Sequence, residues 1–230
     1  MSKMLSVIIA LLLFFVPSAP AEDLPPALDG WFPLFYGPAI LNMKGPFIDP
    51  ADFPEEPGVY LSPLDDLGRP GPARARLNRS AFPTAPRSSL SGLEPAGWQW
   101  DTYEFLAGTV YNRSHLIGNQ LCGIDTIENI FTGTAYLNQE LMAGVENSLY
   151  FYLDATGNTV LYAVTPIYDG DELVPQGILI EAQSLEDDSF VRSLYLFNIQ
   201  PGICIDYATG ETELAPIKVQ PYYGPGFIPD

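Results

Sequence analysis

Metal-binding and redox-active side chains are scarce in this sequence of 230 residues. It contains one histidine, His115, and two cysteines, Cys122 and Cys204. Zinc sites built from four cysteine or histidine ligands are therefore excluded. A catalytic metal would have to depend mostly on oxygen ligands, which suits Mg²⁺ or Ca²⁺.

Long hydrophobic runs are also missing. The longest, Leu5–Val16, is shorter than the roughly 20 residues that a transmembrane helix needs. It follows Lys3 and precedes the small residues Ala19–Ala21, an arrangement typical of a signal peptide. We predict that residues 1–21 are a cleaved signal peptide and that the protein is secreted. A lipid-anchored form is disfavoured because no cysteine lies near the cleavage point.

Positive charge is the third scarcity, with 10 Lys and Arg against 28 Asp and Glu and a net charge of −18. Six arginines nevertheless gather in one stretch of the chain: Arg69, Arg74, Arg76, Arg79, Arg87 and Arg113. The planar guanidinium suits bidentate phosphate contacts. The alternative is a solvated arginine surface that moderates repulsion in an acidic fold, and charge alone does not decide between the two.

After cleavage, 209 residues remain, enough for one domain with a sizeable core. Residues 22–60 are rich in proline and aromatic side chains and lack a sustained period, so we predict an extended N-terminal segment before a main domain over residues 61–230. Apolar spacing predicts a helix from Asn138 to about Asp154. Predicted strands span residues 106–111, 130–134, 160–167, 177–182 and 193–200. Because no helix separates the last three strands, the class is α+β with an antiparallel sheet.

Several motifs follow one another between residues 64 and 210. In order they are LDDLGRPGPA, PR followed by EPAGW, YNRSHLIGNQL, ENIFTGTAYLN, GVEN, VTPIYDGDELVPQGILIEA and NIQPGICIDYATG. Together they resemble the DNA/RNA non-specific endonuclease family, and within it the secreted streptococcal-type DNases. The resemblance implies a ββα-metal finger packed on a central antiparallel sheet, and it makes residues 61–230 an endonuclease domain.

The resemblance also implies roles for individual residues. The family's Asp/Asn-Arg-Gly-His motif falls on residues 112–115, which makes His115 the general base. Asn138 matches the metal-binding asparagine, and Glu146 matches a glutamate that supports the water shell of the metal. Arg113 and Arg87 match arginines that face the phosphate.

The resemblance extends to one more position and has three departures. Asn129 matches the asparagine of the family's KNL motif, a substrate-binding position. Ser114 replaces the usual glycine, Glu128 a common lysine and Ala135 a frequent arginine. The last two replacements weaken the expected substrate contacts.

The chemistry of these residue types agrees with such a role. Histidine is a suitable base near neutral pH, and a Mg²⁺ ion keeps most of its water shell, so one asparagine is an adequate ligand. Asn138 and Glu146 are eight residues apart and project on roughly one helix face. The alternatives are an imidazole that fills space at His115, a helix N-cap at Asn138 and a solvated helix face at Glu146.

These inferences predict a secreted, Mg²⁺-dependent endonuclease, with Mn²⁺ as an alternative ion. It would hydrolyse phosphodiester bonds of DNA, with RNA as an open second substrate. One alternative is a protein with a nuclease fold that binds nucleic acid or a protein partner without cutting. A second is a secreted structural or interaction protein. The oligomeric state stays open.

The two cysteines depart together from the resembled family, where both positions look to be commonly threonine. In a chain with a signal peptide, this coincidence suggests a disulfide between Cys122 and Cys204. The bond would close 83 residues and contribute roughly 4–5 kcal/mol by chain entropy. The alternative is two small buried thiols.

Overall fold

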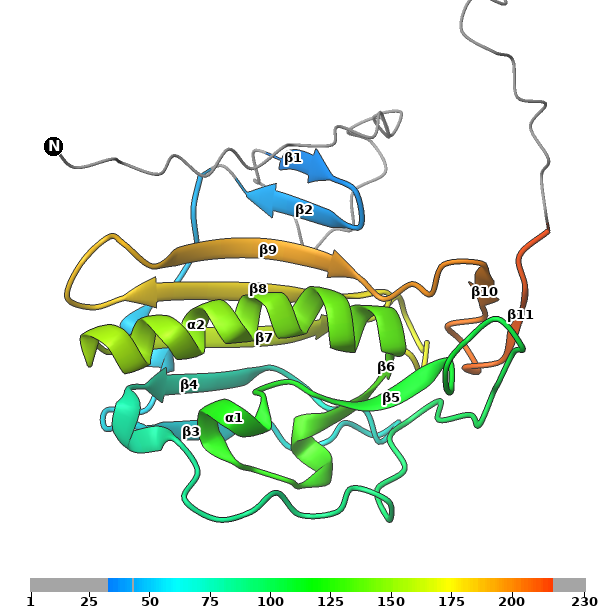
Figure 1. Ribbon diagram of the computed structural model, residues 1–230, viewed down its shortest axis with the longest axis horizontal. Coiled ribbons are helices and arrows are strands. Elements are labelled where there is room, and N and C mark those ends of the chain that lie inside the picture. The colour runs from blue at the N-terminus through cyan, green and yellow to red at the C-terminus, as the bar shows by residue number, and fades with distance from the viewer. Residues whose placement is uncertain (1–32, 43, 217–230) are drawn as a thin grey trace, which may run out of the picture.

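An antiparallel sheet of seven strands forms the centre of the computed structural model, which describes residues 33–42 and 44–216. The strand order is β1-β2-β9-β8-β7-β4-β3 (Figure 1). In chain order the strands are β1 (Pro33–Tyr36), β2 (Ala39–Asn42), β3 (Gly58–Leu61), β4 (Ala73–Leu77), β7 (Val160–Ile167), β8 (Gly177–Ser184) and β9 (Val191–Phe197). The predicted signal peptide lies outside the described residues, and no helix within them is long and apolar enough to cross a membrane.

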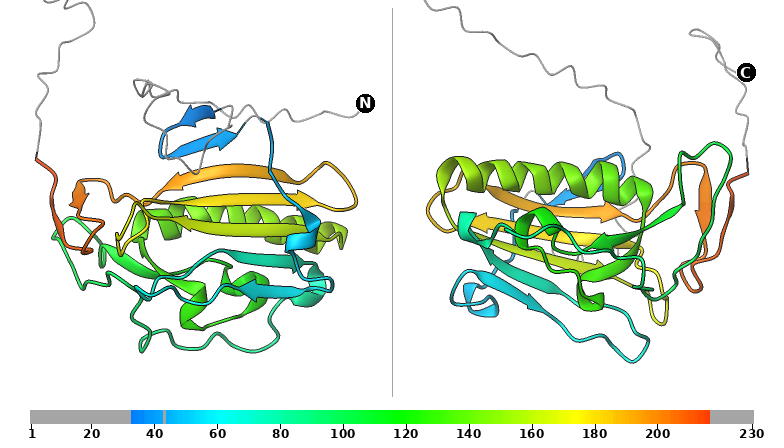
Figure 2. Two further views of the ribbon diagram at one scale, coloured as in Figure 1. Left: turned by 180° about the vertical axis from the view of Figure 1, so that it is seen from behind. Right: turned by 60° about the horizontal axis from the view of Figure 1, so that its bottom comes forward.

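Helix α2 (Ala143–Thr156) covers one face of this sheet (Figures 1 and 2). Its Leu149 and Leu153 are completely buried and belong to the same core cluster as Val160 and Tyr162 of β7. Burying a leucine side chain contributes about 1.5–3 kcal/mol to folding. The helix is therefore fixed against the sheet by these apolar side chains.

A ββα finger precedes and includes this helix. Strand β5 (Tyr111–His115) pairs antiparallel with β6 (Ile130–Thr134), and the π-helical segment η6 (Leu137–Met142) leads into α2. The connection between the two strands contains the short helix α1 (Asn119–Cys122) and the 3-10 turn η5 (Ile127–Asn129). The predicted fold class, α+β with a ββα finger on an antiparallel sheet, is confirmed.

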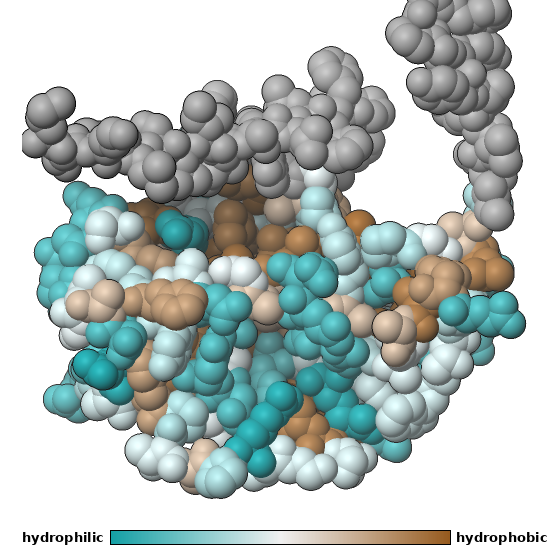
Figure 3. Space-filling model, viewed as in Figure 1, coloured by the Kyte–Doolittle hydropathy of each residue, from teal (hydrophilic) through white to brown (hydrophobic). Residues whose placement is uncertain are grey.

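The remaining elements are small. Two 3-10 turns, η3 (Pro50–Asp52) and η4 (Arg79–Ala81), connect strands, and a hairpin of β10 (Ile203–Ile205) and β11 (Thr212–Leu214) projects at one end of the molecule (Figure 2). Hydrophobic side chains gather at this end in Figure 3, where Leu214 is 57% exposed.

The structure confirms some predicted elements and moves others. The strands at 130–134 and 160–167 are confirmed, β8 is two residues longer than predicted, and β9 begins and ends earlier. The strand predicted at 106–111 is wrong, because Leu106 N–H closes a turn onto Tyr103 and the strand begins only at Tyr111.

The N-terminal segment differs from its prediction as well. Its described part supplies strands β1, β2 and most of β3 to the central sheet, and β2 pairs with β9 near the end of the domain. The boundary predicted between residues 60 and 61 falls inside β3. Short strands of four residues carry no periodic signal of their own. β1 and β2 pair with each other as a hairpin, and β2 and β3 join the sheet through β9 and β4.

Candidate active site

His115 is the last residue of β5, and its side chain is only 8% exposed. Its Nε2 lies 2.8 Å from Oδ1 of Asp125, which is itself 7% exposed at the side chain. Asp125 also accepts hydrogen bonds from Ser88 N–H and from Asn119. The imidazole of His115 is thus buried and held in place by its hydrogen bond to Asp125.

The surroundings of His115 favour its neutral form. Burial lowers the pKa of His115, and the charge of Arg87 acts in the same direction, whereas the bond to Asp125 opposes both. Burial also raises the pKa of Asp125, but hydrogen bonds from His115 and Ser88 outweigh it and leave that pKa below its usual value. With an ionised Asp125 accepting the Nε2 proton, Nδ1 is the nitrogen with a free lone pair.

Asn138 lies in η6 and turns its amide toward the finger. Its Nδ2 donates to Oδ1 of Asn112 over 3.1 Å, and Gln139 donates to the same oxygen. The N-cap alternative for Asn138 is excluded, because Thr134 accepts the Leu137 N–H at the start of this helix. Asn138 lines the hollow described below, and its Oδ1 accepts no hydrogen bond within residues 33–42 and 44–216.

The alternative that Glu146 lies on a solvated helix face is wrong. The residue as a whole is half-buried, and its Oε1 is completely shielded and has no hydrogen-bond partner in the described structure. Burial raises the pKa of Glu146 to about 7, although the Gly118 N–H opposes this. A Cβ at Gly118 would meet the carboxylate of Glu146 and displace it, so the glycine allows this close approach.

The π-helical turn of η6 assists the alignment of these two residues. A π-helix bonds each residue to the fifth along the chain, so it rotates less per residue than an α-helix does. Over the eight residues from Asn138 to Glu146, this wider turn brings both side chains nearer to one face. Both line one hollow of about 460 Å³ together with His115 and Arg87.

This hollow continues into a longer groove. Asn138, Gln139 and Arg87 also line a second hollow of about 520 Å³, whose other wall holds Trp98, Trp100 and Arg113. A third hollow shares Asn112 and Gln139 with the second, and includes Ala135. The three together define the groove, which runs past the reactive side chains.

The two arginines predicted to face phosphate differ in their contacts. Arg87 is exposed on the rim and makes no salt bridge within the part of the chain that the structure describes. Arg113 donates from Nε to the carbonyl of Leu93 and from Nη2 to that of Ser91, and its guanidinium packs on two tryptophans. Arg113 therefore holds the loop of residues 91–100 and brings positive charge to the groove wall.

Three of the other four arginines of the basic stretch have partners within the fold. Arg69 pairs with Asp65 at 2.7 Å, and Arg79 with Asp154 at 3.1 Å. Arg76 donates to the carbonyl of Pro54. These three arginines therefore contact the protein itself, whereas Arg87 and Arg113 line the groove.

Asn129 does not bind substrate. It is completely buried, its Oδ1 accepts from Ile117 N–H, and its Nδ2 donates to the carbonyls of Ile117 and Ile124. Through these hydrogen bonds, the side-chain amide of Asn129 holds the loop after His115 against the rest of the finger. The predicted substrate role is wrong because all of its polar atoms already have partners inside the protein.

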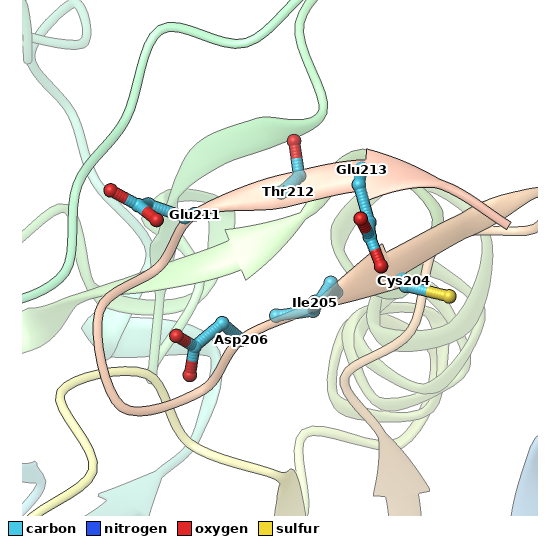
Figure 4. Close-up of a pocket in the computed structure, with 6 residues that line it drawn as sticks. All are labelled: Cys204, Ile205, Asp206, Glu211, Thr212 and Glu213. Carbon is cyan, nitrogen blue, oxygen red and sulfur yellow. The ribbon is translucent and has the colours of Figure 1, made fainter.

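The predicted disulfide is also absent: Cys122 and Cys204 are both free. Cys122 lies in α1, whereas Cys204 is exposed on β10, and Figures 1 and 2 show these elements well apart. Figure 4 shows Cys204 beside Glu213 in the hairpin hollow, which also holds Asp206 and Glu211. The coincidence of two cysteines in the sequence carried no information about their separation in space.

Sequence reasoning missed Asp125 and assigned no role to Asn112. The position of neither residue in the sequence predicts its contact with His115 or Asn138, because these contacts form only in the folded finger. Asn112 stood inside the histidine motif, which is the one available signal. The fold and groove thus define an α+β protein with a ββα finger, whose histidine, asparagine and glutamate face one hollow.

Comparison with known proteins agrees with this description. The sequence model of the DNA/RNA non-specific endonuclease family matches residues 54–186, more than half of the chain. The chain belongs to this family. A comparison with curated proteins finds none that matches.

Solved nuclease structures are similar to the chain. NucA from Streptococcus agalactiae with magnesium ion bound gives a TM-score of 0.73 at 24% identity, over 82% of this chain and 92% of NucA. The Sda1 nuclease with bound zinc ion gives 0.61 at 25% identity, over 69% and 82%. An extracellular endonuclease gives 0.55 at 26% identity, over 69% and 87%. The likeness to NucA shows the fold, and with the family it identifies this protein as a nuclease.

Proposed function

We propose that the protein is a secreted, Mg²⁺-dependent endonuclease that hydrolyses phosphodiester bonds of DNA, with RNA as a second substrate to be tested. The observation that carries the proposal is the convergence of His115, Asn138 and Glu146 on one hollow beside an exposed arginine. Secretion is supported by the apolar run Leu5–Val16 and by the likeness to an extracellular endonuclease.

The general base in this mechanism is Nδ1 of His115. It takes a proton from the water that attacks phosphorus, and the ionised Asp125 at Nε2 stabilises the resulting imidazolium. Departure of the 3′-oxygen leaves a 5′-phosphate. Arg87 on the rim attracts the phosphate, and contacts to the backbone explain cleavage without base preference.

The residues present fit a metal ion with few protein ligands. Oδ1 of Asn138 has no hydrogen-bond donor among the described residues and would serve as the ligand atom, and the unpartnered Oε1 of Glu146 is a buried acceptor suited to a cation or its water shell. Within residues 33–42 and 44–216, no three His, Cys, Asp or Glu side chains cluster to hold an ion. When bound, Mg²⁺ would supply charge stabilisation on the phosphoryl oxygens.

A plasmid assay tests the function. Supercoiled plasmid incubated with the protein should be nicked and degraded with Mg²⁺ or Mn²⁺ and stay intact with excess EDTA. Asn138→Ala should raise the Mg²⁺ concentration needed for half-maximal activity, because it removes the neutral oxygen ligand. Asn147 is an exposed amide of α2 that accepts a hydrogen bond from Gln120 and does not itself line the hollow. Asn147→Ala is therefore the matched control and should leave the Mg²⁺ titration unchanged.

The same assay can contradict the proposal. Plasmid that stays intact with either ion, while a gel shift shows binding, would favour the alternative of a nuclease fold that binds without cutting. An unchanged Mg²⁺ titration in Asn138→Ala would remove Asn138 from the metal site and leave the nuclease activity standing.

A further inference from the structure

Two tryptophans and one arginine form a stack on the groove wall. Trp98 and Trp100 belong to the loop of residues 91–100, whereas Arg113 comes from β5. The guanidinium carbon of Arg113 lies 4.2 Å from the ring centroid of Trp98 and 5.1 Å from that of Trp100. The two indoles meet edge to face, with centroids 5.4 Å apart. Arg113 thus fixes both rings relative to β5, the strand that ends at His115.

The outer ring of this stack is unusually open. Trp100 is 65% exposed, whereas Trp98 is half-buried. Folding gains little from leaving most of a large aromatic side chain in water. Trp100 lines the same hollow as Asn138, so the open indole faces the groove in which the proposed cleavage takes place.

The chemistry of the wall suits a nucleobase. An indole offers a flat apolar surface, and Arg87 and Arg113 put positive charge in the same hollow of a strongly acidic protein. A nucleic-acid strand has this combination of flat bases and anionic phosphates. In a duplex the base faces are already stacked on one another, so only an unpaired base can place its face on Trp100.

We propose that Trp100 is a stacking platform for an unpaired base of the substrate, and that it gives the protein a preference for single-stranded segments. The inference rests on the proposed function, because it assumes that nucleic acid occupies the groove. Arg113 and Trp98 act on the platform by holding the indole in place.

Binding in EDTA tests the platform without cleavage. Fluorescence anisotropy would compare a labelled oligothymidylate with a labelled hairpin duplex of similar length. Trp100→Ala should weaken single-strand binding by roughly 5- to 150-fold, the range expected for one base–aromatic stack. Duplex binding should change little. Trp100→Phe should recover part of the affinity, whereas Trp100→Leu, which keeps apolar bulk without the ring, should not.

A control and the opposing outcomes complete the test. Phe151→Ala removes an aromatic side chain that is 67% exposed on α2 and should leave both affinities unchanged. Equal losses on single strand and duplex, no loss, or full recovery by Trp100→Leu would each overturn the platform. Plasmid cleavage by the unmodified protein is scored separately. If the unmodified protein cleaves plasmid but Trp100→Ala binds single strands normally, only the stacking platform is contradicted. If Trp100→Ala weakens single-strand binding but the unmodified protein does not cleave, only the proposed nuclease function is contradicted.

Discussion

The two ends of the groove are built in different ways. At the reactive end, His115 comes from a strand, and Asn138 and Glu146 come from consecutive helical segments, so regular backbone fixes all three. At the aromatic end, Trp98 and Trp100 come from a loop without helix or strand, held by Arg113.

This difference matches what each end has to do. Chemistry requires side chains held within a fraction of an ångström, which rigid elements and supporting hydrogen bonds provide. Contact with a variable strand of nucleic acid tolerates a loop, where binding residues often lie. We therefore expect substitutions at the reactive end to act on the rate of cleavage, and those at the aromatic end to act on binding.

Removal of the base should give the largest effect and is the strongest test of this division. His115→Gln keeps a donor toward Asp125 but lacks a basic nitrogen, and it should lower kcat by ~10²–10⁴-fold. Single-strand binding in EDTA should stay near that of the unmodified protein. The measurement is cleavage of a fluorogenic oligonucleotide at saturating Mg²⁺.

The buried state of His115 requires a stability control. Because the side chain is 8% exposed, His115→Ala leaves a cavity, and its thermal unfolding has to be recorded beside its activity. If a folded His115→Gln protein retained more than about a tenth of the activity, His115 would not be the general base.

Local pattern explains which parts of the fold could be predicted. Strands β6 and β7 were predicted to the residue because their apolar content lies within one short segment. The short strands β1, β2 and β3 could not be found in the same way, since β1 and β2 form a hairpin that joins the sheet through β9, and β3 joins it through β4. The π-helical turn of η6 was also missed, because its residues have an ordinary helical pattern.

In the site, too, residues within a local sequence motif could be predicted, and contacts between distant residues could not. The family motifs pointed to three residues whose side chains do converge, His115, Asn138 and Glu146. They could not distinguish a substrate contact from a structural one, and Asn129 is a buried structural residue. Asp125 lies ten residues beyond His115 in a loop, and only the closed finger brings the two together.

Asp125 gives the second prediction, with a smaller effect on rate. Asp125→Asn keeps an oxygen acceptor for Nε2 and removes the charge, so kcat should fall by roughly 10- to 100-fold, less than loss of the base itself. Since Asp125 raises the pKa of His115, that pKa should fall further in the variant. Activity rises with pH as the base loses its proton, so the rise should move to lower pH.

The pH profile distinguishes an effect of Asp125 on His115 from a purely structural role of Asp125 in the loop. A loss of activity that is equal at all pH values, with the rise left in place, would show that Asp125 only supports the loop. Ser88→Ala is a suitable control, because it keeps the backbone N–H that Asp125 accepts and should leave the profile unchanged.

Glu146 gives the smallest expected effect on rate and connects the reactive end to stability. Glu146→Gln should raise the Mg²⁺ requirement several-fold, less than Asn138→Ala does, because a carboxylate acting through water is replaced by an amide. Its effect on the metal-free protein should be opposite in sign. The pKa of Glu146 is about 7 in the folded chain, above its ordinary value of 4.5, so the folded state holds the proton more tightly.

The sign of the pH dependence follows from this raised pKa. Stability from the protonated carboxyl is fully present below about pH 4.5 and is lost as the pH rises through about 7. In EDTA at pH 8, Glu146→Gln should therefore be more stable than the unmodified protein, by on the order of 3 kcal/mol, and the two should converge near pH 4, where the carboxyl is mostly protonated in the folded and the unfolded chain alike. Thermal unfolding at both pH values measures this, and an equal pH dependence in the two proteins would show that Glu146 is solvated. A buried carboxylate whose Oε1 has no partner lowers stability at neutral pH, and the proposed role toward a cation gives a reason to keep it. In this respect the reactive end of the groove differs from the aromatic end.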